Sequence, residues 1–360
     1  MKIAVITCYY SPDYVRARTL RAALKTFPDV KLSIVKNRHK GLLRYPEVLW
    51  KLWQVRKKRR PDVYVLTFRG QEILPFVLLM AGDKPVWFDE FIVPIAYASH
   101  EGHRKSFGMR VKHFLARVSE PLYKNWLRRC SVVLADTRAH AELSARTSHM
   151  NLSKYLAVPV GTDETLFRLA EVVQRPEKFQ VFYYSTGMQP LHGIPVVLEA
   201  ARQLQNHKDI EFLIVGGKKV MRSAVASAQA SGARLRYEPW IPFEELVTTI
   251  QSSSLCLGGP LGGTPQARHV ITGKTYQFLA CGVPVLVGAS EATSEYFVDK
   301  QNALVVEQDD AGALVRAIAW AAKHPNELRA IAENGRKLYE KQFSTKAIAG
   351  LLAPLIDGVS

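Results

Sequence analysis

The sequence has few cysteines and no long hydrophobic run. Its four cysteines, Cys8, Cys130, Cys256 and Cys281, are widely scattered and form no C-x-x-C pair, which argues against a zinc site or a disulfide framework. The longest apolar runs, such as ILPFVLLMAG, are too short to cross a bilayer. The opening residues MKIAVITC lead directly into a strand without a basic region or a cleavage site, so we expect no signal peptide. These absences favour a cytoplasmic protein with reduced thiols.

The loop after the first strand contains no glycine. Residues 3–7 form a fully apolar strand, as a buried parallel sheet requires, and CYYSPD follows it. A dinucleotide-binding domain needs G-x-G-x-x-G at this place to admit the pyrophosphate, so the sequence argues against a dehydrogenase. No D-x-D phrase precedes the second half of the chain, where we interpret Asp309-Asp310 as a helix cap. A metal-dependent mechanism is therefore not indicated.

Acidic residues are scarce relative to basic ones. The 360 residues include 49 Lys and Arg against 32 Asp and Glu, which gives a formal net charge of +17 and a pI near 9.7. This balance suits a polyanionic partner, which can be nucleic acid, anionic lipid or a phosphate-bearing substrate. The hydrophobic content of 48% is that of a globular protein, and the length predicts two domains.

Short apolar strands alternate with helical segments in both halves of the chain. In the first half we expect strands at 3–7, 31–35, 63–68, 85–88, 132–135 and 155–160. In the second half we expect them at 181–184, 212–215, 235–237, 255–257, 285–287 and 303–306. Such alternation predicts an α/β fold with parallel sheets and helices on both faces. Two such sheets predict two facing domains with the site in the cleft between them.

The stretch from Arg268 to Gly288 is the most informative part of the second half. Gly273-Lys274 opens a helix there, and a helix start attracts anions because its N–H groups are unpaired. Lys274 adds a full positive charge, and Gln277 lies three residues further on the same helical face. Both side chains can therefore reach one ligand. The alternative is an ordinary α/β connection with a surface lysine.

The segment KTYQFLACGVPVLVG resembles the K-x-[YF]-[EQ]-x-[LM]-A-x-G-x-P-V signature of GT-B glycosyltransferases in the large retaining family 4. Around it, TGMQPLHGIPVVLEAA, FLIVGG, PWIPFEEL, SSSLCLGG and SEYFVDKQNALVVEQDD fit that family in order. In the first half, FRGQEILP, FDEF, ADTRAHAE and VPVGTDETLF stand where the family has related phrases. The resemblance covers nearly the whole chain.

This resemblance implies the GT-B fold, with two facing Rossmann-like domains and an interdomain cleft. Residues 1–165 would be the acceptor-binding domain, 166–340 the nucleotide-sugar-binding domain, and 341–360 a helix that crosses back to the first domain. The implied activity is metal-independent, retaining transfer of a sugar from a nucleotide-diphosphate sugar, UDP- or GDP-linked, to a lipid-linked or other anionic glycan acceptor. No further cofactor is required.

The resemblance also implies site residues, with departures from the family pattern. Relatives often have arginine and lysine in a G-R…K-G phrase, where this chain has Met188 and His192-Gly193. The family's acid pair falls here on His269 and Gln277. Lys274 would be the main cation on the diphosphate, while His192 would hydrogen-bond it or have a local role. Asp89 would contact the donor sugar, with Glu90 as second choice. The residues implied to border the nucleotide-sugar are Gly187, Gly193, Gly216, Gly217, Gly262, Gly263, Thr264, His269, Gln277 and Glu295, the last of which is alternatively a local cap.

Basic residues of the first half suit an acceptor or a membrane. Arg16 and Arg18 line the start of the first helix, where they meet an acidic acceptor or form a solvated basic face, and Arg69 follows the third strand. A helix over 45–60 carries two tryptophans beside the run RKKRR, which suits an anionic membrane surface. Its alternative is a helix packed on the sheet with solvated basic residues at its end. The side chains assigned to the membrane are Trp50, Trp53, Lys57 and Lys58.

The irregular segment 92–108, with two histidines, is interpreted as an acceptor-side loop. The whole pattern predicts a cytoplasmic hexosyltransferase attached peripherally to the inner face of the membrane through its basic first domain. Nucleic acid is the less favoured partner, because no RRM-like or KH-like phrase accompanies the basic run. The rival hypothesis is a catalytically inactive GT-B-fold binding protein or partner subunit, which the missing arginine, lysine and acid favour.

Overall fold

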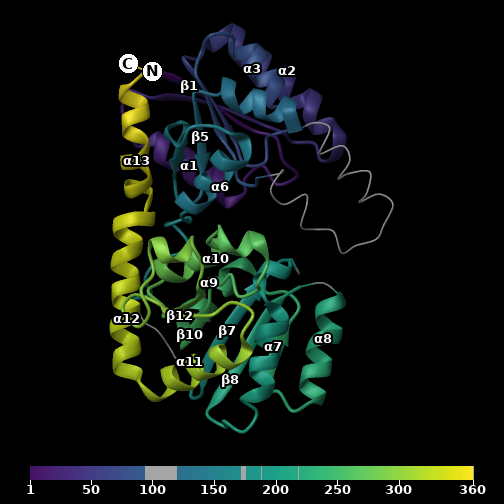
Figure 1. The fold of residues 1–360 in the computed structure, drawn as a ribbon, viewed down its shortest axis with the longest axis vertical. Coiled ribbons are helices and arrows are strands. Elements are labelled where there is room, and N and C mark those ends of the chain that lie inside the picture. The colour runs from purple at the N-terminus through teal and green to yellow at the C-terminus, as the bar shows by residue number, and fades with distance from the viewer. Residues whose placement is uncertain (94–119, 172–175, 188, 218, 360) are drawn as a thin grey trace. The chain divides into compact units, whose positions relative to one another are not determined.

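The computed structural model describes residues 1–93, 120–171, 176–187, 189–217 and 219–359. The chain divides into two compact units (Figure 1). Unit 1 comprises Met1–Gly161 and Thr345–Ser360, and unit 2 comprises Thr162–Ser344. The sequence predicts the boundaries after residues 165 and 340, and the units divide after 161 and 344. Most of the predicted loop over 92–108 lies outside the described residues.

Unit 1 contains a six-stranded parallel sheet in the order β2-β1-β3-β4-β5-β6. The first strand lies next to both the second and the third, so the chain reverses direction of winding between β1 and β3. The strands are β1 (Lys2–Thr7), β2 (Lys31–Lys36), β3 (Val63–Thr67), β4 (Val86–Asp89), β5 (Val132–Ala135) and β6 (Tyr155–Ala157).

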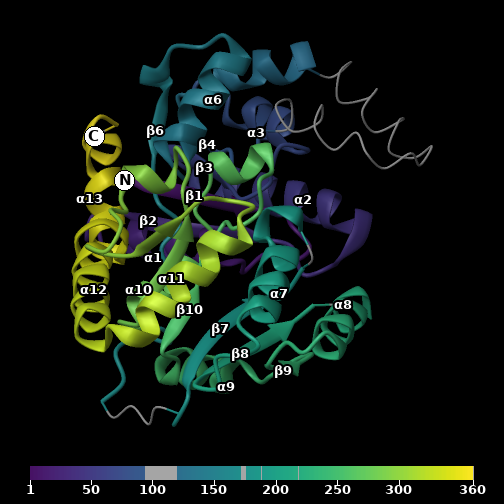
Figure 2. The same ribbon diagram turned by 60° about the horizontal axis from the view of Figure 1, so that its bottom comes forward.

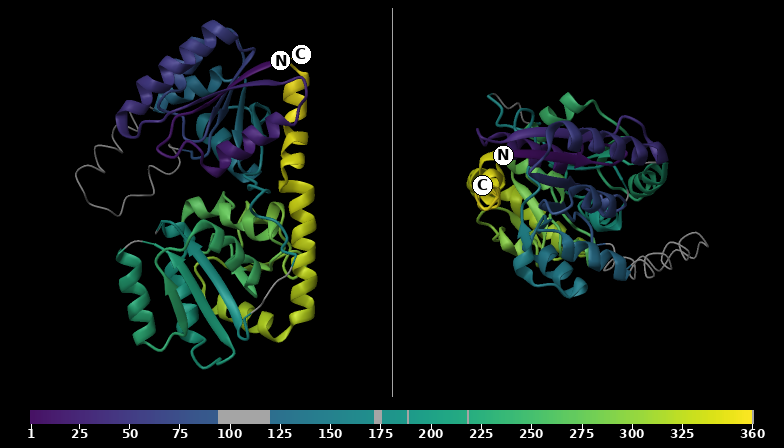
Figure 3. Two further views of the ribbon diagram at one scale, coloured as in Figure 1. Left: turned by 180° about the vertical axis from the view of Figure 1, so that it is seen from behind. Right: turned by 90° about the horizontal axis from the view of Figure 1, so that it is seen from above.

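Helices cover both faces of this sheet because successive strand residues point to opposite sides. On one face, Ala4 and Ile6 of β1 pack with residues of α2, α3 and α6. On the other face, Ile3 and Val5 pack with α1 and with α13, which lies beside α1 although it ends the chain (Figure 3). Among the described residues of unit 1, the helices are α1 (Val15–Lys25), η1 (Gly41–Leu43), α2 (Arg44–Arg59), α3 (Leu74–Ala81), α6 (Arg138–Ser148), η2 (Leu152–Lys154) and α13 (Thr345–Asp357), and residues 120–129 are also helical.

Unit 2 contains a second six-stranded parallel sheet in the order β12-β11-β10-β7-β8-β9, of which Figure 2 labels β10, β7, β8 and β9. Its strands consist largely of buried apolar residues, as expected for a sheet covered on both faces. They are β7 (Phe179–Ser185), β8 (Ile210–Gly216), β9 (Leu235–Glu238), β10 (Leu255–Leu257), β11 (Val285–Gly288) and β12 (Leu304–Val306).

The core on one face of the second sheet joins strand residues to α7, α8 and α11. The N-terminus of α11 is capped by Asp310, whose side chain accepts a hydrogen bond from the Ala313 N–H, which confirms the predicted cap. The helices of unit 2 are η3 (Pro190–His192), α7 (Ile194–Gln203), α8 (Lys219–Ala230), α9 (Phe243–Ser252), η4 (Pro265–Arg268), α10 (Gly273–Ala280), η5 (Thr293–Glu295), α11 (Ala311–Lys323), α12 (Pro325–Leu338) and η6 (Tyr339–Phe343).

The described part of the chain has no helix that is both long enough and apolar enough to span a bilayer. All four cysteines are buried as free thiols.

Candidate functional site

The sheet of unit 2 has a topological switch point between β7 and β10. From β7 the chain winds outward through β8 and β9, and β10 then pairs with the opposite side of β7. In open α/β sheets, ligands bind at the carboxyl ends of the strands at such a point, because the connections leave in opposite directions there. The loops after β7 and β10 are therefore the first place to look for a site.

These two loops contact each other through glycines. The Gly262 N–H donates to the Leu191 carbonyl at 3.1 Å, and a side chain at Gly262 would overlap the carbonyl oxygen of Pro190. A Cβ atom at Gly193 would lie 2.6 Å from the Gly262 nitrogen, and Gly193 itself has a φ of +67°. Glycine is required at both positions for the backbones to approach this closely.

Lys274 lies in the first turn of α10 and is buried, with 6% of its surface exposed. Its Nζ donates to the carbonyl of Tyr184 at 3.3 Å and lies 3.8 Å from the centre of the Tyr183 ring. Burial lowers the pKa of Lys274 to about 7, because removal from water penalises the charged form. Gln277 lies on the same side of α10, where its Oε1 accepts a hydrogen bond from the Tyr184 hydroxyl.

His192 lies near this lysine, at the end of η3. The Tyr183 hydroxyl donates to the His192 carbonyl at 3.3 Å, so the tyrosine contacts both basic residues. Burial and the charge of Lys274 lower the pKa of His192 to about 3, which keeps the imidazole neutral at physiological pH. Its Nδ1 is buried and has no hydrogen-bond partner among the described residues.

The pair of Lys274 and His192 has no negatively charged partner among the described residues. In the part of the chain that the structure describes, no carboxylate pairs with Lys274, whose polar contact is a backbone carbonyl. A buried cation is ordinarily paired, since an unpaired charge in a medium of low dielectric constant is unfavourable. An anion held between Lys274 and His192 would supply the missing charge and would raise the pKa of both groups.

Three further predicted glycines lie at the same edge of the sheet. Gly216 ends β8 opposite Ser185 of β7, and its backbone lies so close to the Ser185 carbonyl that a side chain there would overlap it. Gly217 has a φ of +89°. Gly187 follows β7, and its carbonyl accepts a hydrogen bond from the Ser185 hydroxyl at 2.5 Å.

The remaining predicted residues of unit 2 have local partners. Thr264 caps η4 by accepting from the Ala267 N–H, next to the exposed Gly263. The ring nitrogens of His269 contact the Pro265 carbonyl at 3.0 Å and the Glu291 carboxylate at 3.1 Å, so this histidine is engaged within the unit. Glu295 ends η5 and is half-buried.

In unit 1 the structure gives Arg16 and Asp89 a different environment from the expected one. Both side chains are fully buried and form an ion pair with an Nη2–Oδ1 distance of 2.8 Å. Arg16 therefore faces the interior of the unit and no solvent-accessible acceptor. Asp89, expected to contact the donor sugar, accepts hydrogen bonds from Arg16 and from the Phe68 N–H. The sequence does not reveal this pair, because 73 positions separate its members.

The second-choice residue Glu90 is also buried. It accepts hydrogen bonds from the Tyr123 hydroxyl at 2.6 Å and from the Ser144 hydroxyl. Burial raises the pKa of Glu90, since its charged form is disfavoured away from water. Neither carboxylate of the FDEF phrase is therefore exposed to a ligand in this structure.

Arg18 is exposed on α1, and Arg69 lies half-exposed just after β3 with its guanidinium 5.8 Å from the Tyr9 ring centre. On α2, Trp50 and Trp53 expose 57% and 42% of their surfaces. Val48 and Leu52 of α2 are buried, as the alternative of a helix packed on the sheet predicts, and the membrane alternative stays a prediction. Lys57 and Lys58 are exposed, and the Lys57 Nζ lies 4.0 Å from the Trp53 ring centre.

Sequence reasoning missed two residues of the unit 2 site. Tyr183 and Tyr184 were included only as members of a strand, although they contact Lys274, His192 and Gln277. Their position at the carboxyl end of the first strand of the unit was an available signal. Thr137 caps α6 by accepting from the His140 N–H. Among the described residues, no cluster of three or more His, Cys, Asp or Glu is suited to a metal ion.

The family described as Glycosyl transferase-like matches residues 196–353 of the chain. This region contains β10, the loop with Gly262, and α10 with Lys274. No curated protein sequence matches the chain.

Several solved structures share the fold over the full length. The Anabaena protein HepE, determined in complex with UDP, covers 99% of this chain and 100% of its own, with a TM-score of 0.72 at 13% identity. Sucrose-phosphate synthase from Thermosynechococcus elongatus covers 100% and 99%, with a TM-score of 0.73 at 16% identity. A glycosyltransferase from Rickettsia africae gives a TM-score of 0.70 at 11% identity, covering 99% and 98%. The predicted fold is confirmed: the chain has two parallel six-stranded α/β sheets of the GT-B type, and residues 196–353 are similar to the glycosyl transferase-like family.

Proposed function

We propose that this protein is a glycosyltransferase that binds a nucleotide-diphosphate sugar through unit 2 and transfers the sugar to a glycan or lipid-linked acceptor. The observation that carries the proposal is the buried Lys274 beside His192, at the switch point of the sheet and without a carboxylate partner. A diphosphate would supply the negative charge opposite Lys274. The match of residues 196–353 to a glycosyl transferase-like family supports the same conclusion, and the UDP complex of HepE favours UDP as the nucleotide.

The chemistry assigned to these residues is stabilisation of the leaving group. Breaking the bond between the sugar C1 and the phosphate oxygen leaves the electron pair on the diphosphate, and this negative charge develops beside Lys274. The N–H groups at the start of α10 and a His192 N–H add to its stabilisation. We propose that Gln277 hydrogen-bonds ribose hydroxyls, where an amide can replace a carboxylate. No metal ion is needed in this scheme, since the lysine supplies the positive charge.

We further propose that transfer retains the anomeric configuration. The acceptor hydroxyl would attack from the face that the diphosphate leaves, and its proton would pass to the departing phosphate oxygen. The resemblance to retaining family 4 motivates this part of the proposal. The anomeric proton coupling in the product, read by NMR, distinguishes it from inversion.

A membrane-bound acceptor is the favoured class, and a surface of unit 1 supports this. Next to α2, Leu42 and Leu43 of η1 expose 81% and 65% of their surfaces. These apolar side chains and the two exposed tryptophans lie on elements joined to the basic run 56–60, a combination that suits an interface rich in anionic lipid. The protein would then work at the cytoplasmic face of a membrane without crossing it.

The test of membrane attachment is sedimentation with vesicles of neutral lipid containing or lacking phosphatidylglycerol. We expect binding that requires the anionic lipid and falls at high salt. Reversing the charge of Lys57 and Lys58 should weaken it by at least about thirtyfold, since each basic residue near such a surface contributes about 1 kcal/mol and a factor of ten corresponds to about 1.4 kcal/mol. Trp240→Ala is the control, because Trp240 is 75% exposed but lies in unit 2. Equal binding by the charge-reversed variant would contradict the membrane proposal.

The test of the transferase itself is the incubation of labelled UDP-, GDP- and ADP-sugars with the protein and a lipid extract. We expect one nucleotide class to be consumed, with its label transferred to the extract and no loss of activity in EDTA. Binding of a nucleotide diphosphate without consumption of any donor would favour the rival, an inactive binding protein of the same fold.

A further inference from the structure

We propose that the switch point of the unit 1 sheet carries an aromatic saccharide-binding subsite, formed by Tyr9, Tyr10, Tyr14, Phe68 and Arg69. We name these five residues the tyrosine platform. A pyranose ring would stack on the exposed tyrosines, with Arg69 beside it for an anionic substituent. Only the identification of the bound saccharide as the acceptor rests on the proposed function. The nucleotide site of unit 2 is tested separately.

The position of the platform is the first argument. In unit 1 the winding direction changes between β1 and β3, and Tyr9, Tyr10 and Tyr14 follow β1 while Phe68 and Arg69 follow β3. The loops at the carboxyl ends of these two strands form the position at which doubly wound sheets bind ligands.

The packing of the platform is the second argument. The Tyr14 and Phe68 rings are stacked with centroids 4.1 Å apart, and the Tyr9 ring lies 4.8 Å from Phe68 and 4.3 Å from Tyr10. Phe68 is buried at 3% exposure, whereas Tyr10 and Tyr14 expose 58% and 36%. Phe68 is thus the buried residue of the platform, and the exposed residues are tyrosines, which present both an apolar ring and a hydroxyl.

The backbone that presents the platform is strained. Phe68 and Arg69 have φ angles of +38° and +54°, which residues with side chains rarely adopt and which concentrate at functional sites. The Phe68 N–H is held by the Asp89 carboxylate at 3.0 Å. Asp89 is in turn held by Arg16, whose Nη1 also donates to the Pro159 carbonyl at 2.8 Å. The buried ion pair is therefore a positioning device for the turn.

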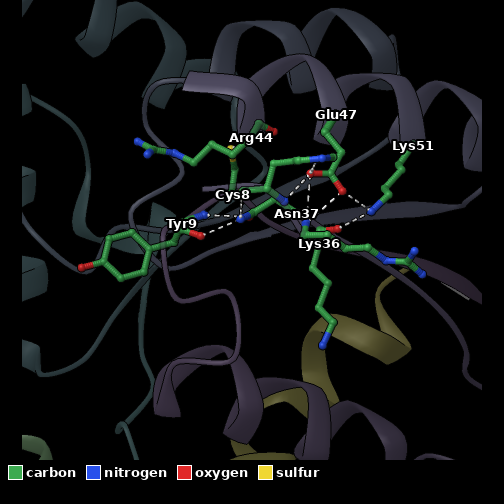
Figure 4. A network of polar contacts seen from close by, with 9 residues as sticks. Cys8, Tyr9, Lys36, Asn37, Arg44, Glu47 and Lys51 are labelled. Atoms are coloured by element: carbon green, nitrogen blue, oxygen red, sulfur yellow. Dashed lines mark hydrogen bonds and ion pairs between the residues drawn. The ribbon is translucent and has the colours of Figure 1, made fainter. Parts of the chain in front are cut away.

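A second device fixes the other side of the platform. The Asn37 side chain accepts from the Tyr9 N–H at 3.1 Å and donates to the Tyr9 carbonyl at 2.9 Å (Figure 4). The adjoining residues are tied to α2 by Glu47, which accepts from the backbone N–H groups of Arg38 and His39. Figure 4 shows the Tyr9 ring projecting away from this network. Two independent supports thus hold the platform before any ligand arrives, which lowers the entropic penalty of binding.

The chemistry of the exposed groups selects the ligand class. One face of a pyranose ring carries C–H groups and suits an aromatic ring, while its rim carries hydroxyls that suit tyrosine hydroxyls. A flat apolar ligand would not need those hydroxyls. Arg69 favours a saccharide that carries a phosphate or carboxylate, since its guanidinium binds such groups in two-pronged fashion.

The experiment is saturation-transfer NMR with methyl pyranosides and hexose 1-phosphates, in saturating UDP to occupy unit 2. We expect transfer to the ring C–H protons of the sugars, and affinity about tenfold weaker in Tyr14→Ala. Tyr14→Phe should retain most of the binding, and Trp240→Ala, an exposed aromatic of unit 2, should bind as the wild type. Arg69→Gln should remove the preference for the hexose phosphates.

Three outcomes would overturn the subsite: no transfer to any sugar, equal transfer in Tyr14→Ala, or transfer to uridine and adenosine in place of sugars. A melting-temperature shift with UDP, measured on the same samples, separates this failure from failure of the proposed function. A protein that binds UDP but no sugar disproves the platform alone.

The positioning role of the ion pair has its own test, the variant Asp89→Asn. Asparagine still offers an acceptor to the Phe68 N–H but leaves the Arg16 charge unpaired. In this variant we expect the affinity for sugars to fall, while UDP still raises the melting temperature through unit 2. The double variant Arg16→Met/Asp89→Asn should recover part of the affinity for sugars. Full sugar affinity in the folded single variant would refute the positioning role.

Discussion

Lys274 is a buried cation whose favourable contacts in the free protein are a carbonyl and an aromatic ring. Its pKa of about 7 lies below the ordinary 10.5, so the folded state favours the neutral amine. The penalty on stability is therefore fully present below pH 7 and disappears as the pH rises toward 10.5. A residue that lowers stability in this way is expected at a site that has a ligand to bind.

The variant Lys274→Met follows from this balance. Methionine keeps the length of the side chain and removes the charge, so at pH 6 the free protein should gain up to about 5 kcal/mol, since the pKa of Lys274 is lowered from 10.5 to about 7 and one pKa unit is worth about 1.4 kcal/mol. Thermal unfolding of the two proteins at pH 6 measures this gain. Lys208→Met, at an exposed lysine of the same unit, should leave stability within about 0.5 kcal/mol. A large loss of stability in Lys274→Met would mean that the lysine is structural.

The same pKa predicts the pH dependence of nucleotide binding. Above pH 7 the free protein loses the Lys274 proton that the diphosphate requires, so UDP affinity should fall by up to about tenfold per pH unit. Binding at pH 8 should then take up a proton, which calorimetry in buffers of different ionisation enthalpy detects. A flat affinity profile between pH 6.5 and 8.5 would contradict the assigned role, and Lys274→Met should show that flat profile.

The sequence predicts single residues well where neighbours along the chain determine their environment. Lys274 and Gln277 are linked by helical spacing, and Asp310 was recognisable as a cap. The Arg16–Asp89 pair and the contact of Asn37 with Tyr9 join distant segments, so no local pattern reveals them. His269 was judged by its place in a family phrase, although its ring is occupied by Pro265 and Glu291.

At the scale of elements, the site of unit 2 depends on the contact between the loops after β7 and β10. Gly262→Ala should force these loops apart, because the added methyl group overlaps the Pro190 carbonyl. We expect a loss of about 1–3 kcal/mol in stability and weaker UDP binding, measured by thermal unfolding and calorimetry. The control is Gly350→Ala in α13, where the new Cβ would have no neighbour within 4 Å.

Alanine at position 350 should stabilise the protein by about 0.5–1 kcal/mol, because glycine within a helix is unfavourable. The two glycine variants therefore should shift the melting temperature in opposite directions. Unchanged UDP affinity in Gly262→Ala would show that the loop contact is not part of the site.

The positions of strands and helices were predicted more accurately than the exposure and contacts of their side chains. The expected strands correspond to the observed ones because each is a short apolar run, and the helix starting at Gly273-Lys274 is α10. Which side chains of α2 are exposed could not be predicted, since burial there depends on the sheet beneath and on α3. The platform residues Tyr9, Tyr14 and Phe68 were likewise missed, because their proximity results from the order of β1 and β3 in the sheet.

At the scale of the whole molecule, the two units share the same arrangement of sheet and functional side chains. Each is a doubly wound parallel sheet, and each concentrates chemically distinctive side chains at its switch point: a desolvated lysine and histidine in unit 2, and tyrosines with an arginine in unit 1. The net charge of +17 agrees with a substrate or surface rich in negative charge. The proposed division of chemistry between a diphosphate site and a saccharide site is what a sugar transferase requires.

The most direct measurement is thermal unfolding of the wild type and of Lys274→Met with UDP, GDP and ADP, each with and without EDTA. A ligand that binds only the folded state raises the melting temperature, by an amount that corresponds to about 2.7 kcal/mol at a hundred times its Kd. We predict that one diphosphate, UDP above all, stabilises the wild type equally in EDTA and fails to stabilise Lys274→Met. No shift with any diphosphate, or an equal shift in Lys274→Met, would contradict the account.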